Sequence, residues 1–90
     1  MPYQIIDPVM AQAVQADAAQ THPLWAWIIM RDLPAYPGAM VARPVTDAPT
    51  PYILIGHTLP ELTAQLPPGL TRSDRQPADP PEVVEVWFPT

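Results

Sequence analysis

Four short segments of the chain carry the apolar patterns typical of β-strands. Residues 24–31 are apolar on both alternating faces until Arg31, which is typical of a central strand covered on both sides. Residues 39–46 and 52–57 are two further runs of strand length, and the short turns between them favour an antiparallel meander. Residues 82–88 alternate along their length, which predicts a last strand with one buried face.

Two other segments carry the signals of helix starts. The aspartate–proline pair at positions 7–8 places a capping side chain before a proline in the first helical position, and residues 9–20 contain neither glycine nor proline. Thr58 and Glu61 fit a capping box, which predicts a second, shorter helix. The proline–proline–glycine sequence at positions 67–69 ends that helix.

These elements predict an α+β fold of order α-β-β-β-α-β, with two short helices and a four-stranded, mostly antiparallel sheet. We expect residues 1–90 to form one small domain, because a chain of this length supports a single core. Residues 1–7 are expected to be extended or loose, and the proline-rich residues 71–81 to form an exposed loop. The long connection before the last strand favours a crossover that places it beside the first strand and partly parallel to the others.

Proline is unusually frequent, at fifteen of ninety residues, and it separates the predicted elements. The apolar fraction of 48% nevertheless argues for a folded domain rather than a disordered one. Pro44 lies inside the second predicted strand. Because proline cannot donate a hydrogen bond to a neighbouring strand, we expect that strand at a sheet edge or next to a bulge.

Charge and composition exclude several classes of function. The formal net charge is −5 and the only basic residues are four arginines, so we expect no direct contact with nucleic acid. The longest apolar stretch, residues 24–30, is far shorter than the roughly 20 residues that cross a bilayer, and no signal peptide is recognisable. The absence of cysteine agrees with a soluble cytoplasmic protein, and isolated glycines give no phosphate-binding loop for a cofactor.

His57 is the first candidate for chemistry, because it ends an apolar strand directly before a helix start. A catalytic role needs partners, and no Ser–His–Asp arrangement lies near it in sequence. The alternative is a strand-end histidine satisfied by a backbone group or water. His22 and His57 are separated by 35 residues and lack the spacing of a metal site, so we expect neither a bound metal nor a cofactor.

Arg72 and Arg75 form the second candidate, because two arginines in an acidic chain can grip a carboxylate or phosphate. The competing interpretation is a solvated loop. Asp79, Glu82 and Glu85 lie close to these arginines in sequence and favour the loop interpretation.

The tryptophans are the third candidate. Trp25 and Trp27 are two residues apart on the first predicted strand and therefore share a face. If Trp87 lies across from them, three indoles form one patch, which is either a core beneath a helix or a surface for another chain. Two short helices offer little cover for both sides of such a strand, which favours contact with a partner.

We therefore expect a small, non-enzymatic domain that works by protein–protein contact, with an unidentified protein or with itself as a homodimer. The candidate binding residues are Trp25, Trp27, Trp87, His57, Arg72 and Arg75, and no catalytic residue is assigned. Two alternatives stay open. One is an acidic inhibitor of a nucleic-acid-binding protein, and the other is a small enzyme that uses His57.

Overall fold

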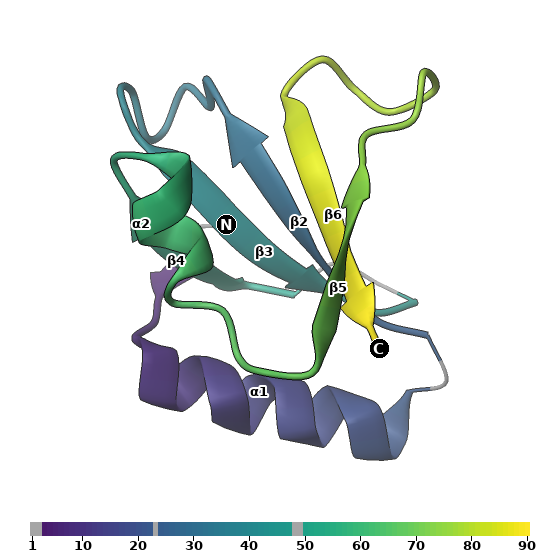
Figure 1. Ribbon diagram of the computed structural model, residues 1–90. Helices are drawn as coiled ribbons and strands as arrows, with labels where there is room; N and C mark the ends of the chain where they lie inside the picture. Colours follow the sequence, from purple (N-terminus) through teal and green to yellow (C-terminus); the bar gives the residue numbers. More distant parts are fainter. Residues whose placement is uncertain (1–2, 23, 48–49) are drawn as a thin grey trace.

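The computed structural model describes residues 3–22, 24–47 and 50–90, and it shows two helices and a six-stranded mixed sheet (Figure 1). The strands lie in the order β1-β4-β3-β2-β6-β5. In chain order the elements are β1 (Gln4–Ile5), α1 (Pro8–Thr21), β2 (Ala26–Arg31), β3 (Met40–Val45), β4 (Tyr52–Gly56), α2 (Leu59–Thr63), β5 (Leu70–Asp74) and β6 (Val83–Pro89). The α+β class is confirmed.

The sheet has two strands more than the sequence predicts. Strand β1 lies within the segment expected to be loose and pairs with β4 in parallel, which makes the sheet mixed. Strand β5 occupies the start of the expected 71–81 loop and pairs antiparallel with β6. The element order is therefore β-α-β-β-β-α-β-β, and the predicted four-stranded sheet is wrong in strand number. Both added strands lie at sheet edges. An edge strand pairs with one neighbour only, so a short or polar segment can form it.

The last strand lies where the sequence places it. Strand β6 pairs with β2, so its position beside the first predicted strand is confirmed. Its direction differs from the expectation, because β6 runs antiparallel to both of its neighbours. The parallel pair of the sheet is β1 with β4 instead.

Pro44 is tolerated in an interior strand because its nitrogen, which carries no hydrogen to donate, faces away from β2. Strand β3 lies between β4 and β2, so the predicted edge position is wrong. The Pro44 carbonyl accepts a hydrogen bond of 2.6 Å from the Thr50 hydroxyl, on the β4 side of the strand. The N and C=O of one strand residue point to the same side, so the missing N–H of Pro44 also faces that side. The β3–β4 register extends only from Met40 to Ala42, and Pro44 lies beyond it.

Both helices begin at the capping residues that the sequence indicates. The Asp7 carboxylate accepts a 2.7 Å hydrogen bond from the Met10 amide, with Pro8 opening α1. The Thr58 hydroxyl accepts a 3.2 Å hydrogen bond from the Glu61 amide at the start of α2. These bonds satisfy amide groups that lack partners inside the helix.

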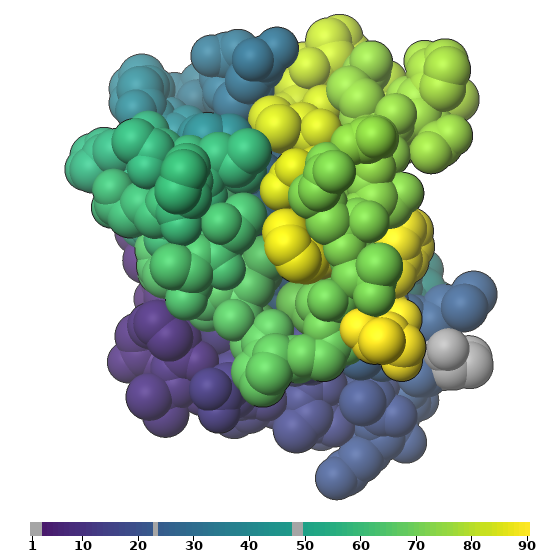
Figure 2. All heavy atoms as spheres, in the orientation of Figure 1, coloured from purple at the N-terminus to yellow at the C-terminus, as the bar shows by residue number. Residues whose placement is uncertain are grey.

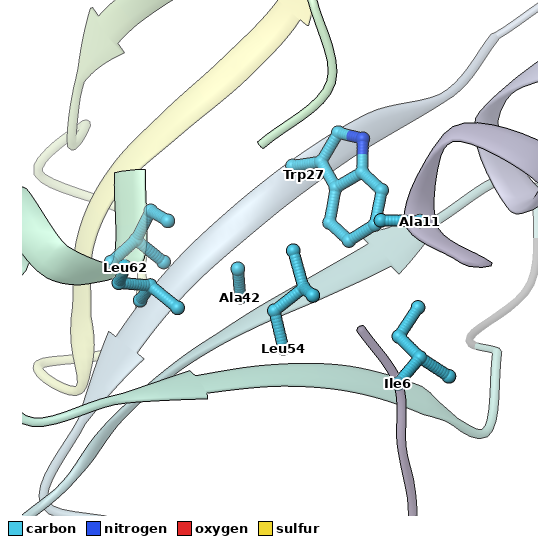
Figure 3. Packing of buried hydrophobic residues seen from close by; sticks show 7 residues of the cluster. Ile6, Ala11, Trp27, Ala42, Leu54 and Leu62 are labelled. Atoms are coloured by element: carbon cyan, nitrogen blue, oxygen red, sulfur yellow. The ribbon is translucent and has the colours of Figure 1, made fainter. Parts of the chain in front are cut away.

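The two helices pack on the same face of the sheet, here called the helix-covered face. The cluster at its centre contains Ala11 of α1 and Leu62 of α2 together with side chains from three strands, and Figure 3 shows these residues pointing toward one another. Its fully buried strand residues are Trp27, Ile29, Ala42 and Leu54. One face of the sheet therefore supplies the core that both helices close.

Candidate functional site

The three indoles share one face, as the sequence suggests, but they do not form an open patch. Trp27 and Trp87 are cross-strand partners in the β2–β6 pair. Trp27 has 0% of its surface exposed, and its indole N–H donates a 2.8 Å hydrogen bond to the Gln15 side chain of α1. A partner protein therefore has no access to Trp27 in this structure, and its place is in the core.

The other two indoles lie at the margins of the helix-covered face. Trp25 is half-buried and lines a hollow of about 210 Å³ between α1 and the Pro67–Pro68 turn. Trp87 is also half-buried and donates a 3.0 Å hydrogen bond to the Glu85 carboxylate. In Figure 2, atoms of β6 reach the surface between α2 and β5, so the cover is incomplete at this edge.

Each of the candidate arginines is occupied by its own partners. Arg72 forms ion pairs with Asp74 at 2.6 Å and with Glu85 at 3.5 Å, and Glu85 itself is only 5% exposed. The hydrogen bond that Arg72 donates to the Asp74 carboxylate, together with the negative charge of Asp74, raises the pKa of the Arg72 guanidinium above its ordinary value. Arg75 donates to the backbone carbonyls of Asp79 and the residue after it, which closes the loop before β6. Both arginines are therefore paired within the chain, which supports the solvated-loop interpretation of residues 72–75 over the anion-site interpretation.

The two histidines have different surroundings. His57 is exposed, and within the described part of the chain it forms no hydrogen bond or ion pair. His22 contacts Asp47 at 3.1 Å and ties the end of α1 to the turn after β3. Residues 3–22, 24–47 and 50–90 hold no group of three or more acidic or histidine side chains suited to a metal ion. A catalytic role for His57 stays a prediction.

The opposite face of the sheet carries the most unusual feature of the molecule, an apolar surface that neither helix covers. The strand registers place one alternate set of side chains on this side, here called the open face. Its members are Ile5, Ala26, Ile28, Met30, Val41, Arg43, Val45, Ile53, Ile55, Thr71, Ser73, Val83, Val86 and Phe88. The core residues of the two helices pack against the other alternate set, on the helix-covered face, which includes Trp27 and Leu54.

Only part of the open face is sheltered by the chain itself. The Arg43 guanidinium lies 4.9 Å from the centre of the Tyr3 ring, and the Tyr3 and Tyr36 rings are 6.5 Å apart. Ala26, Val41, Ile53 and Val83 on this side are buried. Ile5 and Phe88 are exposed, and the other large apolar side chains of the face are half-buried: Ile28, Met30, Val45, Ile55 and Val86.

A hollow interrupts the open face at its β2–β6 end. It has a volume of about 200 Å³ and is lined by Leu24, Trp25, Ala26, Val45, Thr46 and Phe88. The small Ala26 side chain pairs with the larger Val45 of β3, and Phe88 of β6 lines the other side of the hollow, which leaves a depression over Ala26. At its rim Phe88 is 47% exposed and Leu24 is 77% exposed. Apolar side chains thus surround a space that they do not fill.

Arg43 is the one charged residue of the open face. Its Nε atom is buried and has no hydrogen-bond partner among the described residues. An unpaired buried donor of this kind costs free energy.

Comparison of this chain with protein-family models, with curated proteins and with solved structures finds no significant match. Among the described residues, neither helix is long and apolar enough to cross a membrane. The functional argument therefore depends on the geometry of this chain.

Proposed function

We propose that this chain is a non-enzymatic protein-interaction domain that binds through its open face, and that the occupant is a second copy of the chain. The observation that carries the proposal is the placement of both helices on one face of the sheet, while the side chains on the other face are largely apolar as well. The sequence favours a patch of three indoles as the contact surface. We propose the open face instead, because Trp27 is fully buried.

The composition of the open face supports a buried rather than a solvated role. An antiparallel sheet with one face in water normally alternates apolar residues inside with polar residues outside. Here the outer set contains Ile, Val, Met and Phe side chains with a single charge, Arg43. Contiguous apolar surface of this kind on a soluble protein usually marks an interaction site.

The size of the face fits self-association. The six strands lie about 4.8 Å apart and are about 18 Å long on average, with the two-residue β1 the shortest, so together they present a face on the order of 500 Å². Two copies that overlap over all six strands bury on the order of 1,000 Å² in projection. This is just below the roughly 1,200 Å² at which the standard range of specific protein interfaces begins. The product is two stacked sheets, with the helices on the two outer sides.

A charge placed on the open face tests the proposal. Val86→Lys puts an ammonium group at the centre of the expected interface, and its desolvation is expected to weaken self-association by at least about tenfold. Val9→Lys is the matched control, because it makes the same change at a residue of α1 that is 79% exposed. Sedimentation equilibrium of both variants beside the unchanged chain measures the difference.

Two results would contradict the proposal. One is equal self-association of Val86→Lys and Val9→Lys, which means that the open face is not the interface. The other is an unchanged chain that remains at 9.9 kDa up to about 100 µM, far above ordinary dimer affinities.

A further inference from the structure

We infer that a second copy of the chain pairs antiparallel with the free edge of β5, about a twofold axis at Ser73, so that two sheets join into one. This contact goes beyond the proposed function, because it uses a strand edge rather than the open face. Strand β5 pairs with β6 on one side, and among the described residues no strand lies on its other side. Figure 2 shows atoms of β5 at the surface of the molecule.

The backbone of β5 offers hydrogen-bonding groups on its free side. The Thr90 amide donates a 2.9 Å hydrogen bond to the Gly69 carbonyl, and these two residues are opposite each other when the β5–β6 register is continued by one pair. Hydrogen-bonded pairs alternate along an antiparallel ladder, so the N–H and C=O groups of Leu70, Arg72 and Asp74 point away from β6. The Asp74 carbonyl agrees with this direction, because its hydrogen bonds of 3.3 and 3.4 Å come from side chains.

The charges along this edge are complementary to a second copy of the same strand. Arg72 and Asp74 are two residues apart, carry opposite charges, and have side chains that are 52% and 83% exposed. In an antiparallel pair centred on Ser73, position 72 of one copy is directly opposite position 74 of the other. Each Arg72 therefore faces the Asp74 of the other copy, and the twofold axis repeats this ion pair.

Other symmetric registers do not match these charges. A pair centred on Arg72 places two guanidinium groups opposite each other, and like charges in this position are destabilising. A pair centred on Thr71 places Arg72 opposite Leu70, and Asp74 then lies opposite position 68, outside the strand. Alternating charge thus selects Ser73 as the centre.

The selected register also uses the free backbone groups. Positions 72 and 74 both present their N–H and C=O groups to the other copy, so they form hydrogen-bonded pairs across the axis. Arg72 has donors to spare, because its contacts with Asp74 and Glu85 both use the Nη1 atom. Exposed ion pairs contribute little by themselves, so we expect the backbone bonds to hold the copies together and the charges to set the register.

The axis is perpendicular to the joined sheet, since neighbouring antiparallel strands are related in this way. The open faces of the two copies therefore lie on the same side and become one continuous surface. The edge contact does not depend on what occupies that surface.

Cysteine substitution tests the register directly, because the chain has no cysteine of its own. Ser73→Cys brings two thiols together in a non-hydrogen-bonded pair, whose Cα atoms are about 4.5 Å apart, within the roughly 4.4–6.8 Å range of disulfides. Thr71→Cys is the matched control on the same strand and face, because its two copies would be about four residue spacings, or roughly 14 Å, apart. Under mild oxidation we expect Ser73→Cys to form a linked dimer at least about tenfold faster than Thr71→Cys.

The control is a strict one, since Thr71 is exposed and Ser73 is half-buried, which favours chance linking at position 71. Far-ultraviolet circular dichroism of the reduced variants checks that both are folded. Equal linking of the two variants, or faster linking of Thr71→Cys, would overturn the inference. Linking that requires a mixture of the two variants would place the axis at Arg72, which would equally overturn it.

Charge reversal tests the ion pairs across the axis. In the Ser73→Cys chain, Arg72→Asp places carboxylates opposite carboxylates, and Asp74→Arg places guanidinium groups opposite guanidinium groups, so each is expected to link more slowly at low salt. A mixture of these two variants restores opposite charges at every position. We therefore expect mass spectrometry of the linked products to show more heterodimer than random pairing gives, whereas random proportions would contradict the Arg72–Asp74 pairing.

Discussion

Replacing Trp27 with alanine is expected to lower the free energy of unfolding by about 3 to 5 kcal/mol, the range for removal of a fully buried aromatic side chain. Trp27 is 0% exposed and touches both layers of the fold, since its ring packs in the core and its N–H bonds to Gln15 of α1. The loss includes the apolar contacts and the connection between helix and sheet. Urea unfolding followed by far-ultraviolet circular dichroism, at one fixed chain concentration, measures it.

A paired substitution separates the hydrogen bond from the packing. Gln15→Leu alone leaves the Trp27 N–H without its partner and is expected to cost about 1 to 3 kcal/mol. Trp27→Phe alone leaves the Gln15 Oε1 atom without this donor, while the Gln15 Nε2 atom still donates to the Pro68 carbonyl. The double variant removes both polar groups, so its loss is expected to be smaller than the sum of the two single losses. A loss below about 1 kcal/mol for Trp27→Ala would contradict the place of this indole in the core.

Replacing Gly56 with valine is expected to lower the free energy of unfolding by about 1 to 3 kcal/mol, because α2 lies directly on this residue. A Cβ atom at Gly56 would meet the Leu62 main-chain N at 3.2 Å and its Cα at 3.3 Å. These atoms belong to the helix backbone, so the helix itself has to move. Gly56→Ala is expected to give a smaller loss in the same direction, measured by the same urea unfolding.

The main-chain origin of this clash provides the control. Leu62→Ala shortens the side chain but leaves the crowding N, Cα and Cβ atoms in place. Adding it to Gly56→Val is therefore not expected to restore stability. Gly38→Ala adds a Cβ in open space and tests only the cost of a positive φ of 75°. Rescue of Gly56→Val by Leu62→Ala would show that side-chain contact, rather than backbone approach, sets the spacing of α2.

Local chemistry explains the parts of the fold that the sequence predicts correctly. Asp7 with Pro8, and the Thr58 hydroxyl that accepts from the Glu61 amide, act within one helical turn, so their effect depends little on tertiary context. The four central strands are also recognisable, because long apolar runs can be buried only inside the sheet.

The two edge strands escape prediction for a physical reason. Strand β1 has only two residues, too few to show a period. Strand β5 reads Leu-Thr-Arg-Ser-Asp, and its pairing depends on contacts made after β6 is in place, including the ion pair from Arg72 to Glu85. An edge strand with charged and polar side chains resembles a loop in sequence.

The sequence predicts an apolar strand surface that contacts a partner, but it does not predict which face of the sheet carries that surface. The pattern of residues 24–31 indicates apolar side chains on both faces of β2, and the structure confirms that both sets exist. Sequence alone does not show which set the helices cover. The indole set draws attention because of its size, whereas Ala26, Ile28 and Met30 form the set left open. The small Ala26, flanked by Val45 and Phe88, was the available signal for a recess.

The most direct test of the open-face account is an isotope-filtered nuclear magnetic resonance experiment on a one-to-one mixture of labelled and unlabelled chains. It detects only proton contacts between different copies. We expect such contacts among the side chains of the open face, including the methyl groups of Ile28 and Val86 and the ring of Phe88. Intermolecular contacts confined to α1, α2 or the outer edge of β5, or no intermolecular contacts at millimolar concentration, would contradict the account.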